Sequence, residues 1–148
     1  MIRDFIETDE AAFMEMADRF YSSDAVVHGV DRSVLKATFD AAISDSPFIR
    51  GLMIELDQRL VGFGLLAFSY ATEIGGTVVL IEDLFIDESC RGRGIGGSFF
   101  EFLWAQYPDA KRFRLELTPV NARAQHLYEL LGFEVLPYIQ MVKETRGL

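Results

Sequence analysis

The segment that most constrains this chain is its glycine loop, residues 91–97, which reads Arg-Gly-Arg-Gly-Ile-Gly-Gly. It lies between an apolar run and an amphipathic helical pattern. Glycine has no Cβ atom, so four glycines within six positions leave the backbone N–H groups open to a ligand. N–H groups at a helix N-terminus attract anions, and Arg91 and Arg93 add positive charge. The segment therefore predicts a binding loop for a pyrophosphate.

Two common nucleotide-binding patterns fit this loop poorly. A Walker A loop needs Gly-Lys-Ser or Gly-Lys-Thr after its glycines, and the chain has neither at this place. Gly92, Gly94 and Gly97 match the dinucleotide fingerprint G-x-G-x-x-G by letter. That fingerprint follows its strand directly, whereas residues 87–90 separate this loop from the preceding apolar run.

The composition indicates one acidic globular domain. The chain has 148 residues, half of them hydrophobic, and a formal net charge of −9. This length is enough to bury a core without disulfides or metals, and we expect residues 1–148 to form a single domain. Binding of nucleic acid needs a basic surface, so the charge argues against it. A small cationic substrate is compatible with the charge, and so is solubility alone.

We expect a protein of the cytoplasm without a membrane span. The apolar stretches are broken every few residues, so none reaches the length of a span. Residues 1–20 carry several acidic side chains, which is untypical of a signal or transit peptide. The single cysteine, Cys90, cannot form an internal disulfide, which favours a reducing compartment. His28 and His126 are not spaced with cysteine or acidic partners as metal ligands are, so no metal is expected.

The hydrophobic periodicity predicts six strands and four helices, which form a mixed sheet with helices on both faces. Thr8 is the predicted N-cap of the first helix, and Gly132 is the residue predicted to end the last one. Helices are predicted around residues 13–20 and 35–43, from the glycine loop to Pro108, and at 121–131. Strands are predicted at residues 1–6, 49–56, 60–71, 77–86, 113–117 and 133–142, with a hairpin turn at 74–76.

Three segments in the same order resemble the GNAT superfamily of N-acetyltransferases. Arg91, Gly94 and Gly96 match the coenzyme A loop of that family, Arg/Gln-x-x-Gly-x-Gly/Ala. Upstream, residues 81–86 resemble the strand that carries an acidic residue and contacts the acyl group. Downstream, residues 121–133 are similar to the helix that ends the conserved core of the family.

The resemblance implies an α/β (α+β) fold, with a mixed, mostly antiparallel twisted sheet of six or seven strands flanked by four helices. Residues 61–70 and 82–85 are most similar to the diamine and spermidine/spermine acetyltransferase subgroup. The resemblance also implies that the strand before the loop splays from its neighbour at 112–117, so that the pantetheine arm of acetyl-CoA hydrogen-bonds there like an added strand. The cofactor-binding residues that it implies are Leu84, Phe85, Ile86, Arg91, Gly92, Arg93, Gly94, Ile95, Gly96, Gly97 and Asn121.

Acetyl transfer to an amine requires a group that removes a proton. A primary alkylamine has a pKa of about 10.4, so a base must accept the proton as the nitrogen attacks the thioester. Glu82, on the strand before the loop, is the candidate base, and binding an ammonium group is an alternative role that stays open. Asp83 is a candidate for substrate binding, although in a regular strand it faces the opposite side unless a bulge redirects it.

The leaving thiolate needs a proton, and the developing oxyanion needs donors. Tyr128 matches the position of the family's acid, and a phenol of pKa about 10 can protonate a thiolate of pKa about 8.5 when the two are adjacent. It follows Asn121 by seven residues, or two helical turns, so both lie on one helix face. Backbone N–H groups of residues 84–86 are the candidate oxyanion donors. Cys90 is interpreted as a packing residue.

These residues predict an acetyl-CoA-dependent N-acetyltransferase that works by direct attack of a primary amine, without a covalent enzyme intermediate. A polyamine or another small cationic amine is the favoured acceptor, while an aminoglycoside, an amino acid or a protein N-terminus stays open. The competing hypothesis is a non-catalytic acyl-CoA-binding domain that senses or scaffolds. The sequence leaves the oligomeric state open, with a homodimer as one candidate.

Overall fold

The computed structural model describes residues 1–145, which form one five-stranded sheet with helices on both faces. The strand order is β1–β2–β3–β4–β5. Neighbouring strands are antiparallel except β5, which is parallel to β4. The strands are β1 (Ile2–Asp4), β2 (Ile49–Leu56), β3 (Arg59–Ala71), β4 (Gly76–Ile86) and β5 (Arg112–Leu115).

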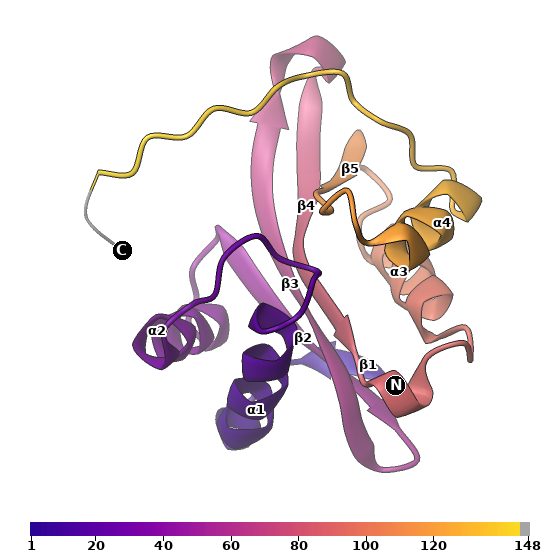
Figure 1. The fold of residues 1–148 in the computed structure, drawn as a ribbon. Coiled ribbons are helices and arrows are strands. Elements are labelled where there is room, and N and C mark those ends of the chain that lie inside the picture. Colours follow the sequence, from indigo (N-terminus) through magenta and orange to yellow (C-terminus); the bar gives the residue numbers. More distant parts are fainter. Residues whose placement is uncertain (146–148) are drawn as a thin grey trace.

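Helices cover both faces of the sheet, as Figure 1 shows. On one side are α1 (Glu10–Tyr21) and α2 (Arg32–Ile43), and on the other α3 (Ile95–Gln106) and α4 (Ala122–Leu130). Short 3-10 turns are η1 (Glu7–Asp9), η2 (Thr72–Ile74) and η3 (Glu88–Cys90). The four predicted helices are confirmed. Within the described part of the chain, no helix is long and apolar enough to cross a membrane.

Phenylalanine rings fill the space between the sheet and helices α1 and α2. The rings of Phe13 and Phe63 meet edge to face with centroids 5.0 Å apart, and those of Phe13 and Phe39 stack at 5.6 Å. All three side chains are fully buried. The predicted apolar stripe of the first helix therefore faces the core, and it fixes α1 to the centre of the sheet.

The first helix begins one residue later than the predicted cap implies. Thr8 lies in η1, and the N-cap position of α1 belongs to Asp9, so the prediction of a Thr8 cap is wrong. Asp9 is buried because its carboxylate binds the Arg3 guanidinium at 2.7 Å and accepts the Ile6 N–H at 2.9 Å. Those bonds favour the 3-10 turn at the position where a threonine cap was expected.

Helix α3 packs on the other face of the sheet through fully buried side chains, among them Phe99 and Leu103. The Phe99 ring lies directly against Gly64 of β3, where a Cβ atom would come within 2.4 Å of the ring. A larger residue at 64 would push the helix away from the sheet. The glycine loop at the start of α3 is thereby held in place relative to β3 and β4.

Strand β4 carries a bulge at the two candidate acids. Leu65 of β3 pairs with Asp83 and Leu66 pairs with Ile81, so Glu82 has no residue opposite it. In a regular strand, Ile81 and Asp83 would face the same side. Here Ile81 packs in the core under α3, while Asp83 points toward α1. The bulge redirects Asp83, as the sequence analysis allowed.

Strands β4 and β5 diverge beyond the bulge. Their pairing ends with Ile81 opposite Leu115, although β4 continues to Ile86. Strand β5 also ends two residues before the predicted Leu117. The splayed strands that the resemblance implied are therefore present, and among residues 1–145 no strand pairs with residues 82–86 on the side of β5.

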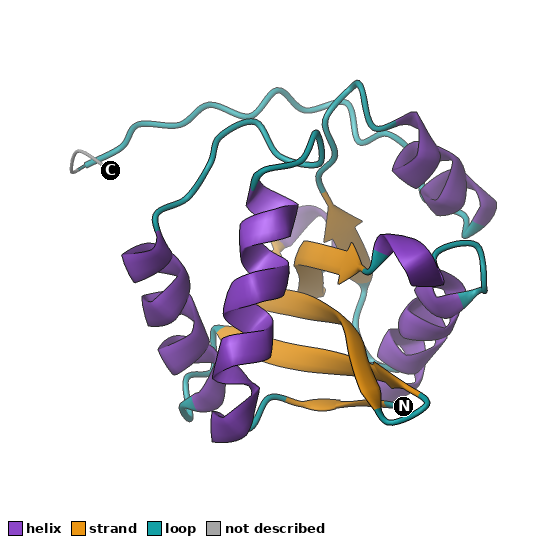
Figure 2. Cartoon of the chain, turned by 60° about the horizontal axis from the view of Figure 1, so that its bottom comes forward, coloured by secondary structure: helices purple, strands orange, loops and turns teal. Residues whose placement is uncertain are grey.

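The strand predicted at residues 133–142 is absent, so the sheet has five strands rather than the six or seven expected. Instead, residues 134–145 run in an extended path away from α4, across the top of the molecule in Figures 1 and 2. Its apolar side chains lie in solvent, with Ile139 93% and Met141 94% exposed. The Tyr138 hydroxyl donates to Glu73 of η2 at 2.8 Å, which holds the segment over the far end of the β3–β4 hairpin. The prediction of a strand here is therefore wrong, because within the described chain this segment pairs with no other strand.

Candidate active site

A cavity of about 920 Å³ lies where β4 and β5 diverge. Its walls are the segment after α1, the bulged end of β4, the glycine loop with the start of α3, and the segment from β5 into α4. Every predicted site residue lines this cavity except Arg93, which is exposed outside it. The glycine loop, the two acids and the tyrosine are thus brought together in one place.

The glycine loop leaves the first turn of α3 open to the cavity. Gly92 and Gly94 have φ angles of 78° and 79°, in the left-handed region that favours glycine. Gly94 is the N-cap of α3, and its carbonyl accepts the Ser98 N–H at 3.0 Å. The N–H groups of residues 95–97 lie in the first turn, where a helix offers them no carbonyl. They can therefore bind an anion.

Gly96 lies where α3 and α4 pack against each other. A Cβ atom there would lie 2.9 Å from the Leu127 Cδ2 of α4, whereas the corresponding positions of Gly94 and Gly97 face open space. A glycine at 96 therefore lets α3 and α4 approach, and this brings α4 and its tyrosine beside the loop.

Arg91 and Arg123 supply the positive charge beside the loop. The Arg91 Nε donates to the Ile86 carbonyl at 2.9 Å, which fixes its guanidinium at the cavity wall. The Arg123 guanidinium lies 3.8 Å from the position of a Cβ on Gly92. Sequence reasoning named Arg93 and missed Arg123, because only the packing of α4 on α3 places Arg123 beside the loop.

Asp87 ties the start of the loop to α1. Its carboxylate accepts the N–H of Ser89 at 2.9 Å, the hydroxyl of Ser89 at 2.7 Å and the guanidinium of Arg19 at 2.8 Å. The bonds from Ser89 and Arg19 hold the pKa of Asp87 well below its usual range. Arg19 also lies over the ring of Phe85, 5.1 Å from its centroid. The loop is therefore anchored to both the sheet and α1.

Asp83 is held by Tyr21, a residue that the sequence analysis missed. Both oxygens of Asp83 accept the Tyr21 hydroxyl, at 2.8 and 2.9 Å. Burial raises the pKa of Asp83 to about 6, against the lowering effect of the Tyr21 hydrogen bond. Burial also raises the pKa of Tyr21, so its hydroxyl stays protonated. A signal was available: Tyr21 follows Ala17 by four residues and so continues the core-facing stripe, where a hydroxyl needs a partner.

Glu82, the bulged residue, also lines the cavity. Desolvation raises the pKa of its carboxyl, the charge of Glu116 raises that pKa further, and Arg114 lowers it. A cavity carboxylate with a raised pKa is a stronger base than an ordinary glutamate, which suits it to accept a proton.

Tyr128 lines the cavity from α4. Its ring packs edge to face on Phe100 and Phe133, with centroids 5.8 and 5.9 Å apart. Burial raises the pKa of the phenol, which keeps it protonated. Tyr128 is therefore packed rigidly and can donate a proton.

Two smaller predictions are confirmed. The side-chain oxygen of Asn121 accepts the Ala124 N–H at 3.3 Å, so Asn121 caps α4 while it lines the cavity. Cys90 is 5% exposed and packs in the core beneath α3.

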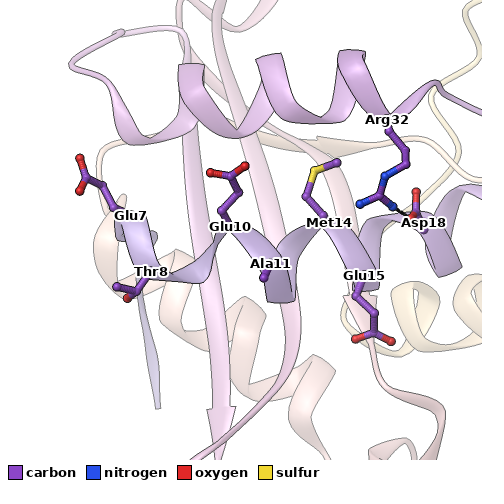
Figure 3. A pocket seen from close by; sticks show the side chains of 8 residues that line it. All are labelled: Glu7, Thr8, Glu10, Ala11, Met14, Glu15, Asp18 and Arg32. Carbon is purple, nitrogen blue, oxygen red and sulfur yellow. Dashed lines mark hydrogen bonds and ion pairs between the residues drawn. The ribbon is translucent and has the colours of Figure 1, made fainter.

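A second, shallower hollow lies on α1 (Figure 3). Its arginine, Arg32, is paired with Asp18, and no predicted site residue contributes to it. We assign no function to this hollow. Its lining residues are Glu7, Thr8, Glu10, Ala11, Met14, Glu15, Asp18 and Arg32.

Comparison with known proteins identifies the class to which this fold and cavity belong. Residues 11–133 match the acetyltransferase (GNAT) family. This match covers most of the chain, so the protein belongs to the GNAT family. It is an acetyl-CoA-dependent N-acetyltransferase.

Relatives of known activity support that assignment. Thialysine N-epsilon-acetyltransferase of Mus musculus is 29% identical over 145 residues, covering 91% of this chain and 84% of the mouse protein. The protein of the same name from Bos taurus is 35% identical over 102 residues, covering 62% of this chain and 59% of the bovine protein.

Solved structures show the same fold. A possible acetyltransferase from Clostridium difficile 630 superposes with a TM-score of 0.82 at 16% identity, covering 99% of this chain and 98% of the other. Aminoglycoside N-acetyltransferase AAC(6')-Iy in complex with CoA superposes with a TM-score of 0.79 at 16% identity, covering 99% and 95%. At sequence identities this low, the structural similarity shows only that the fold is shared.

Proposed function

We propose that the protein acetylates a primary amine of a small cationic substrate of the polyamine type. The observation that carries this proposal is the lining of one cavity: it is bordered by the N-terminus of α3 and by two carboxyl groups of β4, Glu82 and Asp83. The first suits a pyrophosphate, and the second suits an ammonium group. The thialysine acetyltransferase relatives also act on an amine, as their name states.

The cavity offers a place for each part of acetyl-CoA. Residues 94–97 would hold the pyrophosphate through their N–H groups, with Arg91 and Arg123 adding charge. Residues 84–86, which have no strand partner toward β5, would hydrogen-bond the pantetheine arm. Asn121 lies on the opposite wall, where it would contact that arm.

The residues of this cavity suffice for transfer by direct attack. Glu82 accepts the proton that the amine nitrogen loses as it attacks the thioester carbonyl, either directly or through a water molecule. Backbone N–H groups of residues 84–86 stabilise the oxyanion. Tyr128 donates its proton to the thiolate as the carbon–sulfur bond breaks. Asp83 binds the ammonium group of the substrate.

A panel of amines in a thiol-release assay tests this function. We expect diamines, polyamines and thialysine to be acetylated, and a diamine to exceed a monoamine of equal length by about tenfold in kcat/KM, an advantage that salt reduces. Tyr128→Phe serves as the site-specific control, because it keeps the packing and removes the proton. Its kcat should fall by roughly tenfold to a few hundredfold. Binding of acetyl-CoA without turnover of any amine would instead favour an acyl-CoA-binding sensor or scaffold.

We also propose that two copies of the chain associate through the C-terminal segment, residues 134–142. The Tyr138 hydroxyl donates to Glu73, which also binds Arg112 at 2.7 Å. The residues that follow Tyr138 run away from the sheet (Figures 1 and 2). Their apolar side chains are exposed, and the outer edge of β5 has no strand partner among residues 1–145. A second copy can cover such side chains and extend such an edge, and two-fold symmetry lets each copy do so for the other.

The oligomeric state tests this association. Light scattering coupled to gel filtration should show a dimer for the native chain and a monomer for Ile139→Asp, because a charge replaces an apolar contact. Phe48→Asp is the matched control, since Phe48 is also an exposed apolar residue, 72% exposed, outside the segment. It should remain dimeric. A monomeric native chain would contradict the proposal.

We place the protein in the cytoplasm, as its cysteine chemistry suggests. Cys90 is a free thiol, buried beside the cofactor loop. A reducing compartment preserves such a thiol.

A further inference from the structure

Asp83 is a buried carboxyl group that the rest of the protein does not neutralise. Asp83 is 7% exposed, and its carboxylate forms no ion pair with a lysine or arginine among residues 1–145. The charge of Glu82, which has the same sign, raises the pKa of Asp83 further. A buried anion of this kind is costly, so the cavity favours a cation at this point.

Within residues 1–145, the side chain that hydrogen-bonds to Asp83 comes from a rigid element. Tyr21 is the last residue of α1, and its ring packs edge to face on Phe20 with centroids 5.0 Å apart. Phe20 in turn packs on Phe63 and Phe85 of the sheet. The phenol therefore cannot move away from Asp83 without disturbing the core.

We propose that Tyr21 is a positioning residue: its hydroxyl holds the Asp83 carboxylate, in orientation and in the ionised state, as the binding group for the substrate's ammonium. This inference rests on the proposed function. One hydroxyl proton is shared by the two oxygens, at 2.8 and 2.9 Å, and a carboxylate has about four lone-pair sites. Tyr21 therefore orients the group and leaves acceptor sites for the N–H donors of an ammonium.

The hydrogen bond also sets the pH at which Asp83 loses its charge. Burial raises the pKa of Asp83 to about 6, Tyr21 lowers it, and Glu82 raises it. Without the hydroxyl, this pKa moves upward toward neutral pH, and a protonated Asp83 no longer attracts a cation. Other titratable or charged groups of the same cavity, from the elements around it, are Arg19, Asp24, His28, Glu88, Arg91, Glu116, Arg123, His126 and Tyr128.

Tyr21→Phe tests the proposal, because it keeps the ring and removes only the hydroxyl. For a diamine at neutral pH we expect KM to rise about tenfold with kcat changed less than about twofold, the pattern of a lost binding contact. The acidic limb of kcat/KM should move up by about one pH unit. Tyr70→Phe is the matched control, since Tyr70 is 71% exposed on β3 and lies outside the cavity.

A second measurement needs no turnover. Carbon-13 NMR titration of the aspartate carboxyls in the ligand-free protein should show the Asp83 midpoint moving to higher pH in Tyr21→Phe, with Asp83→Asn identifying the signal. In the Asp83→Asn background, Tyr21→Phe should leave KM unchanged, because the two residues act through one contact.

These measurements separate the two proposals. If the Asp83 midpoint moves but no amine is acetylated, the proposed function fails while the coupling of Tyr21 to Asp83 stands. If amines are acetylated but Tyr21→Phe leaves KM, the acidic limb and the midpoint unchanged, the positioning role is wrong.

Discussion

Replacing Gly94 by valine should weaken the binding of acetyl-CoA by about two orders of magnitude, the loss of roughly two hydrogen bonds to a charged group. Gly94 is the N-cap of α3 with a φ of 79°, and the place of its Cβ is open space at the cavity. A branched side chain there strains the backbone and covers the N–H groups of the first turn. Titration calorimetry with coenzyme A measures the effect.

The same substitution at Gly75 is the control for backbone strain. Gly75 has a φ of 63° and open space around its Cβ position, but it lies in the turn between η2 and β4, outside the cavity. Gly75→Val should lower the melting temperature as Gly94→Val does and leave the affinity for coenzyme A unchanged. If a folded Gly94→Val protein bound coenzyme A with native affinity, the loop would not be part of the binding site.

Local signals in the sequence were enough to predict the loop and most elements. A glycine-rich run before a helix and the spacing of apolar residues both determine local structure within a few positions. They therefore indicate the same element whatever packs against it. The turn before β4 and the end of α4 followed from Gly75 and Gly132, whose φ angles are 63° and 90°. The bulge at Glu82 was anticipated as an option, but no sequence signal placed it.

Contacts between distant segments could not be predicted in this way. Tyr21 and Asp83 are 62 residues apart, and only the packing of α1 on the sheet brings them together. Arg123 approaches the loop because Gly96 lets α4 lie close to α3. The strand predicted at residues 133–142 is wrong for a related reason. Its apolar pattern indicates a strand, but pairing with the open edge of β5 also depends on the path that the chain takes after α4.

The second large effect is expected from Glu82→Gln, which keeps the shape of the side chain and removes the proton acceptor. At pH 6, kcat/KM should fall by about a hundredfold or more, within the range for loss of a general base. The loss should shrink as the pH rises toward the amine pKa of about 10.4, because the substrate then arrives deprotonated. Rate profiles against pH, with a diamine as acceptor, measure this.

Protonation of Asp83 cannot account for the loss of kcat/KM expected at low pH in Glu82→Gln. Glu82 raises the pKa of Asp83, so removing the Glu82 charge lowers that pKa and keeps Asp83 ionised to lower pH. Amine binding should therefore be retained in Glu82→Gln while proton transfer is lost. Glu101→Gln removes one charge from an exposed position of α3 outside the cavity, and it should follow the native profile. If Glu82→Gln gave a profile parallel to the native one, with the loss confined to KM, Glu82 would bind the ammonium without accepting its proton.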